Sequence, residues 1–195
     1  DPVDGKVHIT LEVAEECIQK RALNYDKDGD NHYDTISAFI KSMRGSDPNA
    51  ALYYLARMLY AGEDPKFIAR RIMICASEDV SNADPMALVV AVNASLAAER
   101  VGMPEAQLIL AQAAAYVATA PKSVATTNGI FEAMKLVEEQ RTAAIPPYLQ
   151  DAHYSDAAKL GHGVGYKYPH LFPDHFVEQQ YLPDAIKDRR YYTFG

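Results

Sequence analysis

Three Asp-Pro pairs constrain the fold of this 195-residue chain more than any other feature of its sequence. They are Asp47-Pro48, Asp64-Pro65 and Asp84-Pro85. An aspartate carboxylate can accept a hydrogen bond from an early backbone N–H of a helix, and proline fits the first helical position because no donor is needed there. Each pair precedes apolar residues at helical spacing, and Gly62 and Gly102 stand where a left-handed residue would end the first and third runs. The sequence therefore predicts three consecutive short helices.

Helical patterns continue on both sides of these three helices. We expect one helix over residues 7–24, another over 35–43, and a fourth bundle helix over 106–118 that Pro121 ends. Ser123 can cap a further helix that runs to about Arg141. The inward stripe predicted for this last helix consists of Ile130, Phe131, Met134 and Val137.

The helix predicted over residues 86–98 is apolar nearly all the way round. A helix with one solvent-exposed side normally carries polar residues on that side. We therefore expect this helix either to lie at the centre of the protomer or to be covered by another subunit.

From Ala144 onward the sequence changes character and becomes rich in Tyr, His, Pro and Gly. Its glycines at 161, 163 and 165 resemble a phosphate-binding loop, but no Gly-Lys-Ser/Thr follows and no strand-then-helix pattern surrounds them. The segment is too aromatic for a disordered tail. We expect an ordered strap that crosses helices or a neighbouring subunit, with ring faces buried and hydroxyls hydrated.

Two patterns imitate metal sites. Asp26, Asp28 and Asp30 alternate as in a calcium-binding EF-hand loop, but the sixth position is Asn31 rather than Gly and the twelfth is Ser37 rather than Glu. A polar turn before a helix is the favoured interpretation. Four tail histidines could also gather around a metal, which is a minority interpretation because their spacing is irregular. They are His153, His162, His170 and His175.

The remaining sequence favours a role other than catalysis. It contains no Walker A motif, nucleophile elbow, HExxH motif or paired-cysteine metal site, so we expect no catalytic, cofactor or metal site on this chain. The net charge of −7 disfavours strong nucleic-acid binding through the global field.

No run is long enough for a membrane span, and the first residues do not form a signal peptide. Cys17 and Cys75 are interpreted as free buried thiols, and the missing initial Met suggests a piece of a longer chain.

Three consecutive stretches carry a family resemblance: GSDPNAALYYLARML, AGEDPKFIARR and ASEDVSNADPMAL. Flanking stretches such as GMPEAQLILAQAAAYVATAPKS and GHGVGYKYPH extend it to nearly the whole chain. They resemble the C-terminal region of the replication-associated recombination protein A family (RarA, also called MgsA), whose eukaryotic relatives are the Werner-helicase-interacting proteins. These are AAA+ ATPases related to clamp loaders. The chain departs from the family at Ser81-Asn82, where Gly-Leu is usual, and at Ala125-Thr126-Thr127.

The resemblance implies an all-α fold: a compact bundle of about five helices, similar to a clamp-loader collar, with an N-terminal remnant of the ATPase lid and an irregular C-terminal strap. The domains expected are 1–33 for the lid remnant, 34–142 for the helical oligomerisation domain and 143–195 for the extension. The parent protein would be a cytoplasmic, nucleoid-associated, DNA-dependent ATPase that acts at stalled replication forks. Its ATP and Mg²⁺ would bind in a domain outside this chain.

For this chain the resemblance implies homotetramer assembly. The candidate interface residues are Leu88, Val92, Leu96, Leu108 and Tyr116. Candidate contacts to DNA or to another domain are Arg57, Arg70, Arg71, Lys167, Arg189 and Arg190. For Arg57, Arg70 and Arg71, salt bridges to Glu63, Asp64, Glu78 and Asp79 are the alternative interpretation. Two other functions stay open: a module that recruits single-strand-binding protein or a polymerase, and a metal-binding or enzymatic domain built on the histidine-rich tail.

Overall fold

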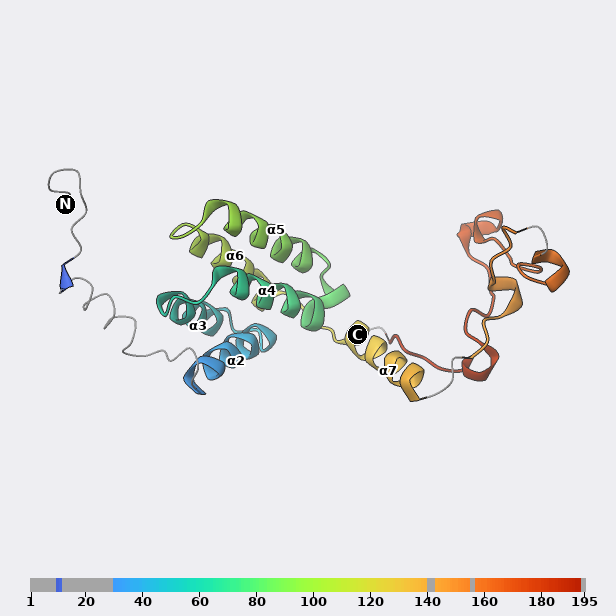
Figure 1. Cartoon of the computed structure of the whole chain (residues 1–195), viewed down its shortest axis with the longest axis horizontal. Helices are drawn as coiled ribbons and strands as arrows, with labels where there is room; N and C mark the ends of the chain where they lie inside the picture. The colour runs from blue at the N-terminus through green and yellow to red at the C-terminus, as the bar shows by residue number, and fades with distance from the viewer. Residues whose placement is uncertain (1–9, 12–29, 140–142, 155–156, 194–195) are drawn as a thin grey trace. The chain divides into compact units, whose positions relative to one another are not determined.

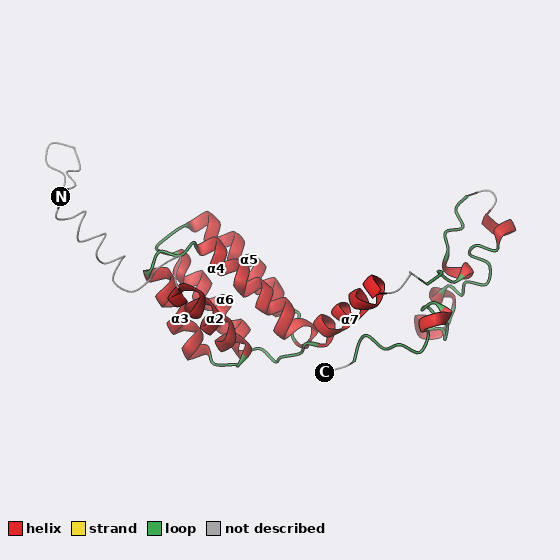
Figure 2. Ribbon diagram, turned by 60° about the horizontal axis from the view of Figure 1, so that its bottom comes forward, coloured by secondary structure: helices red, strands yellow, loops and turns green. Residues whose placement is uncertain are grey.

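The computed structural model describes residues 10–11, 30–139, 143–154 and 157–193. Helices and loops account for all of these residues, and no strand occurs among them (Figure 2). The predicted all-α class is therefore confirmed. The chain divides into two compact units, one that ends at Thr127 and one over Asn128–Thr193. The helix expected over 7–24, the aspartates at 26 and 28, Cys17 and most of the lid remnant lie outside the described residues, and the predicted domain boundaries stay predictions.

Among the described residues, five helices lie wholly within the first unit (Figure 1). They are α2 (Asp30–Arg44), α3 (Pro48–Tyr60), α4 (Pro65–Cys75), α5 (Met86–Val101) and α6 (Ala106–Thr119). A π-helical turn, η1 (Ala76–Val80), extends α4, and a short 3-10 turn, η2 (Ser81–Ala83), leads toward α5.

The Asp-Pro pairs start three of these helices, as predicted. The Asp47 carboxylate accepts from the Ala50 backbone N–H at 2.9 Å, and Asp64 accepts from Lys66 N–H, also at 2.9 Å. For α5 the expectation is met only in part: the N-cap position is Pro85, and Asp84, one residue before it, accepts from Met86 N–H at 3.1 Å. Each carboxylate satisfies a donor that has no partner inside the helix.

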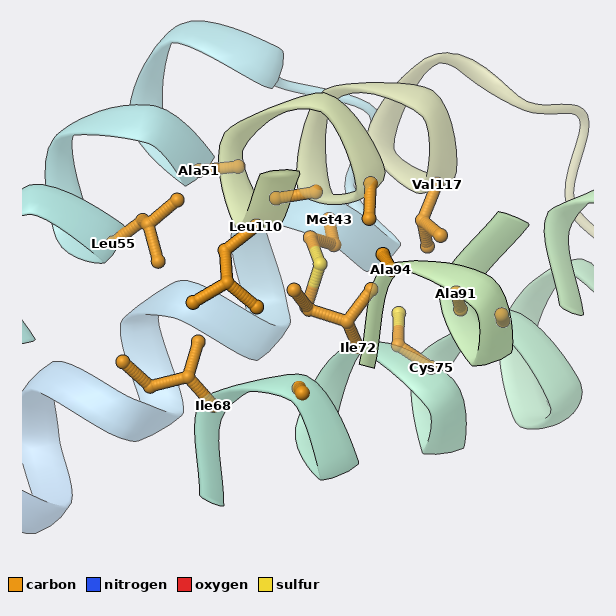
Figure 3. Packing of buried hydrophobic residues seen from close by; sticks show 14 of the residues in the cluster. Met43, Ala51, Leu55, Ile68, Ile72, Cys75, Ala91, Ala94, Leu110 and Val117 are labelled. Carbon is orange, nitrogen blue, oxygen red and sulfur yellow. The ribbon is translucent and has the colours of Figure 1, made fainter. Parts of the chain in front are cut away.

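Helix α6 lies at the centre of the bundle and contacts α2, α3, α4 and α5. Its Leu110 and Val117 point into a core that receives Met43 from α2, Leu55 from α3 and Ile72 from α4 (Figure 3). Phe39, Met58 and Ile68 are further large side chains with almost no exposed surface. Burial of each such side chain stabilises the fold by about 1.5–3 kcal/mol.

Alanines form the buried face of α5. They recur with spacings of four, three and four residues and are Ala87, Ala91, Ala94 and Ala98. Because their side chains are small, the backbone of α5 can approach α6, whose facing surface is also rich in alanine.

The opposite side of α5 is exposed, although it too is apolar. The expectation that this helix lies at the centre of the protomer is wrong, because α6 takes that position. The other expectation, cover by another subunit, stays a prediction.

Polar contacts connect η1 to its neighbours within the first unit. Asp79 is only 3% exposed, and it accepts from Arg44 Nε at 2.6 Å and from Cys75 Sγ at 3.2 Å. Its backbone carbonyl accepts from Ser123 N–H at 2.8 Å. Together these bonds fix the end of α2 and the start of the segment that leads to α7.

Ser81 follows η1 with φ 53° and ψ −135°. Glycine adopts such a backbone conformation without a steric cost, whereas an L side chain is strained by on the order of 1 kcal/mol or more. In this chain the Ser81 hydroxyl forms a hydrogen bond with the Thr126 hydroxyl.

Helix α7 (Ala125–Glu139) begins as predicted, since the Ser123 hydroxyl accepts from Ala125 N–H at 3.3 Å. Its predicted inward stripe is wrong: Ile130, Phe131, Met134 and Val137 are 48–66% exposed. The buried residue of α7 is Gly129 instead, where an added Cβ would lie 2.5 Å from the Tyr191 carbonyl oxygen. The chain near Tyr191 approaches the helix at its smallest residue.

Residues 143–193 contain short 3-10 turns separated by extended chain, consistent with an irregular extension. Several of these turns begin at proline, as in Pro147–Leu149, Pro169–Leu171 and Pro173–His175. Most aromatic rings of this segment are exposed in the single chain, so the expectation that they pack over helices or over a neighbouring subunit stays a prediction. Between 37% and 74% of the surface is exposed in Tyr154, Tyr166, Tyr168, Phe172, Phe176, Tyr181 and Tyr192.

Candidate assembly surface

An apolar row follows the exposed side of α5. Leu88, Val92 and Leu96 are four residues apart, so their side chains lie one above the other along the helix. They are 41%, 38% and 54% exposed, and the adjacent Val89 is 50% exposed. We call Leu88, Val89, Val92 and Leu96 the α5 row. The structure brings three of the five predicted interface residues together in it.

An ion pair lies close to this row. Lys66 Nζ of α4 donates to Glu99 Oε1 of α5 at 2.6 Å. The hydrogen bond with Glu99 raises the pKa of Lys66, and the same bond lowers the pKa of Glu99. Both side chains are more than half exposed, so the pair contributes little to stability. It supplies polar, charged groups of the kind that surround an apolar contact.

Leu108 belongs to a different surface. It is 68% exposed and lines a groove of about 660 Å³ between α3 and the start of α6. We call this the α3/α6 groove. Its other lining residues are Leu52, Tyr53, Leu55, Ala56, Arg57, Leu59, Tyr60, Met103, Gln107 and Ala111. The α5 row contributes no residue to this lining, so the predicted interface divides into two surfaces.

The Tyr116 side chain forms a hydrogen bond within the protomer. Its hydroxyl donates to Asp84 Oδ2 at 3.0 Å, and this hydrogen bond raises the pKa of Tyr116. The ring packs against the core. Tyr116 therefore connects α6 to the start of α5, where Asp84 also accepts from Met86 N–H.

The three arginines proposed for DNA or inter-domain contact lie on α3 and α4. Arg57 lines the α3/α6 groove with its guanidinium 5.9 Å from the centre of the Tyr53 ring. Arg70 lies over Phe67 at 5.3 Å. Both geometries are cation–π contacts. Arg71 is half-buried, and no hydrogen-bond partner lies within reach of its Nε among the described residues.

Two of the four predicted alternative partners of these arginines pair with another arginine. Glu78 and Asp79 pair with Arg44, at 3.0 and 2.6 Å. Sequence reasoning missed Arg44, because a contact between residues 35 positions apart leaves no periodic signal. The hydrogen bond to Asp79 raises the pKa of Arg44, so this guanidinium stays charged throughout the ordinary pH range.

Lys122 is a second cation that the sequence did not single out. Its Nζ donates to Ser46 Oγ at 3.1 Å and to the carbonyls of Ala118 and Ala120 at 3.0 and 2.6 Å. Burial lowers its pKa. These bonds join the turn after α2 to the end of α6, which is a structural role.

The basic candidates of the second unit are held by local contacts. Lys167 donates its backbone N–H to Gln179 Oε1 at 2.9 Å. Arg189 and Arg190 line a hollow of about 460 Å³ together with the acidic side chains of Glu132, Glu139 and Asp188. Because both acidic and basic side chains line the hollow, it has no strong preference for an anion such as phosphate.

The four tail histidines make separate contacts. His153 bonds to Asp151, His162 bonds to the Tyr154 hydroxyl, and the rings of His170 and His175 lie 5.0 Å apart. Among the described residues, no three His, Cys, Asp or Glu side chains converge as metal ligands would.

Comparison with known families gives two consecutive matches. Residues 45–195 match the model described as the MgsA AAA+ ATPase C terminal, and residues 1–44 match the AAA C-terminal domain. The chain belongs to the MgsA family of AAA+ ATPases. The boundary between the two matches falls directly after Arg44, at the end of α2.

The curated relatives that this chain resembles support its assignment to the MgsA family. Over 98% of its length it is 50% identical to replication-associated recombination protein A of Bacillus subtilis, and over 96% it is 40% identical to the Escherichia coli protein of that name. It is 39% identical to ATPase WRNIP1 of Dictyostelium discoideum over 91% of its length. The chain spans less than half of these relatives: 45%, 42% and 20% of their lengths. The resemblance predicted from the sequence is confirmed.

In the part of the MgsA-family chain that the structure describes, no helix combines the length and the apolar character needed to cross a membrane.

Proposed function

We propose that this chain is the assembly region of an MgsA-family ATPase and that it joins copies into a homotetramer. One observation carries the proposal: the α5 row presents four aliphatic side chains, each 38–54% exposed, along one side of an otherwise well-packed helix. Exposed apolar patches of this kind mark interaction sites, because water contact with them is unfavourable. A helix row that meets its own copy makes a self-complementary contact, which pairs two protomers, and a second contact between such pairs completes a tetramer.

In the whole protein, this assembly would hold several ATPase modules together. ATP and Mg²⁺ would bind in the domain that precedes this region, and hydrolysis would be coupled to DNA at stalled or damaged replication forks. The name of the bacterial relatives, replication-associated recombination protein A, supports that setting. We propose that the cytoplasmic, nucleoid-associated protein meets DNA and single-strand-binding protein through surfaces of the full-length chain. Arg70 and Arg71 of α4 are the candidates for such contacts on this region.

A substitution in the α5 row tests the assembly proposal. Leu96→Asp would place a charge within the apolar contact, at the C-terminal end of the α5 row, where desolvation of a carboxylate is unfavourable. We expect association to become less favourable by about 2 kcal/mol or more. This corresponds to a roughly 30-fold larger dissociation constant. Sedimentation equilibrium over a range of protein concentrations measures this constant.

The matched control is Tyr33→Asp on α2, which also replaces an exposed apolar residue with aspartate (Tyr33 is 68% exposed). Its dissociation constant should equal that of the unmodified chain. Because Leu96 is 54% exposed, Leu96→Asp should keep its helical circular dichroism and cooperative unfolding. Unchanged association of the folded Leu96→Asp variant would contradict the proposal.

A further inference from the structure

Two of the four tail histidines lie next to each other within the second unit. His170 belongs to the 3-10 turn η5 (Pro169–Leu171), and His175 belongs to the following turn, η6 (Pro173–His175). The centres of the two rings are 5.0 Å apart, and the ring planes are tilted by 56°. Both residues therefore form a local pair, whose geometry is set inside a short stretch of chain.

The backbone holds this pair together. Phe172 N–H donates to the Pro169 carbonyl at 2.9 Å, and His175 N–H donates to the Phe172 carbonyl at 3.2 Å. Asp174 and His175 have φ values of 57° and 54°, in the left-handed region, and so form a tight turn between the two histidines. Two successive turns thus place two imidazole rings side by side.

The ring nitrogens of this pair are not engaged within the chain. Neither ring forms a hydrogen bond or ion pair with a described residue, whereas the other described histidines each have a partner. Those pairs are His32 with Glu63, His153 with Asp151 and His162 with Tyr154. A neutral imidazole whose acceptor nitrogen has no partner keeps that lone pair for a ligand.

The separation of the two rings is the one that a shared metal ion requires. A Zn–N bond of about 2.0–2.1 Å, plus about 1.1 Å from the nitrogen to the ring centre, places each centre about 3.1 Å from the metal. At the tetrahedral angle of about 109°, two such rings have their centres about 5.1 Å apart. The observed 5.0 Å agrees with this value, so one ion can join the rings while the backbone stays in place.

We propose that His170 and His175 bind one divalent transition-metal ion of the kind that prefers imidazole ligands, namely Zn²⁺. Two protein ligands leave the other coordination positions to water, in agreement with the absence of a third His, Cys, Asp or Glu ligand from the pair in the described part of the chain. Such a site is open and reversible, unlike the closed four-ligand sites of zinc fingers. The bound ion connects η5 to η6 and stabilises the turn between them, whether or not copies of the chain assemble.

Isothermal titration calorimetry of the 195-residue chain with Zn²⁺ tests the site. We expect one ion per chain, and we expect His170→Ala and His175→Ala each to weaken its binding by roughly 10-fold or more. The matched control is His153→Ala, another tail histidine of the second unit, which should bind Zn²⁺ as the unmodified chain does. No Zn²⁺ binding, equal binding by His170→Ala, or an equal loss in His153→Ala would each overturn the proposal.

Hydrogen exchange of the unmodified chain, with and without Zn²⁺, gives a second readout that needs no substitution. We expect the ion to slow exchange in residues 168–176 and to leave α2–α6 unchanged, and a chelator should reverse the effect. Slower exchange elsewhere without an effect on residues 168–176 would assign the ion to other groups and overturn the proposal. This readout also decides the question if a histidine variant fails to fold.

Discussion

At the scale of single residues, the most constrained polar group is Asp79. Its carboxylate is buried, and a buried charge is tolerated only with a partner and hydrogen bonds. Arg44 supplies the charge at 2.6 Å, and the Cys75 thiol donates to the second oxygen at 3.2 Å. Since Arg44 is itself 48% exposed, the pair avoids the desolvation cost of two fully buried ions.

Cys75 gives a prediction about alkaline stability. Burial, together with the hydrogen bond to Asp79, raises the pKa of the Cys75 thiol to about 12. In the unfolded chain the thiol pKa is near 8.5. The contribution of the protonated thiol to stability is thus fully present below about pH 8.5 and is lost as the pH rises through about 12. In that window it lowers the free energy of unfolding by about 1.4 kcal/mol per pH unit.

Urea unfolding of the unmodified chain and of Cys75→Ala, at several values between about pH 8.5 and 11, measures this effect. The variant lacks the thiol, so its stability should decline less steeply with pH even though it is less stable at neutral pH. Cys17 is present in both chains and cancels in the comparison. Parallel pH curves for the two chains would show that the Cys75 thiol does not titrate as expected.

At this scale the sequence predicted local bonds well and distant ones poorly. The caps from Asp47 and Asp64 were predictable because each carboxylate bonds to a backbone N–H two or three residues away. The pair of Arg44 with Asp79 was not, because it depends on how α2 and η1 meet in space.

At the scale of elements, the contact between α7 and the chain near Tyr191 gives a second prediction. Gly129→Ala would place a methyl group 2.5 Å from the Tyr191 carbonyl oxygen, so the two backbones must separate. We expect a loss of about 1–3 kcal/mol from this contact, although alanine favours a free helix by about 1 kcal/mol over glycine. Hydrogen exchange should become faster in residues 188–193 and stay unchanged in α2–α6.

The matched control for Gly129→Ala is Glu138→Ala, at an exposed position of the same helix outside the hollow lined by Arg189 and Arg190. It should leave the exchange of residues 188–193 within the range of the unmodified chain. Slower exchange in Gly129→Ala, as helix propensity alone would produce, would contradict the close approach.

The elements themselves were predictable, but their places in the bundle were not. Asp-Pro pairs, glycines and apolar spacing located α3, α4, α5 and α6. Both α5 and α6 lack a polar stripe, so the pattern could not show that α6 is central and that α5 has an exposed side. For α7, the apolar stripe suggested an inward face, while the contact is made at Gly129.

At the scale of the whole molecule, exposed apolar side chains gather in two places on the first unit. They form defined surfaces, the α5 row and the α3/α6 groove, rather than single scattered side chains. The sequence predicted that this chain would have more apolar helical surface than one copy can bury. It could not separate Leu108 from the three candidates on α5, because that separation depends on the packing of α3 beside α6. Nor could it show that Tyr116 bonds to Asp84 inside the protomer.

Static light scattering of the unmodified chain tests the central claim, assembly through the α5 row, most directly. The protomer mass is 21.5 kDa. We predict a mass of about four protomers at micromolar concentration, without added nucleotide or DNA, and a mass of no more than about two protomers for Leu96→Asp under the same conditions. A mass of 21.5 kDa for the unmodified chain up to high micromolar concentration would contradict the account.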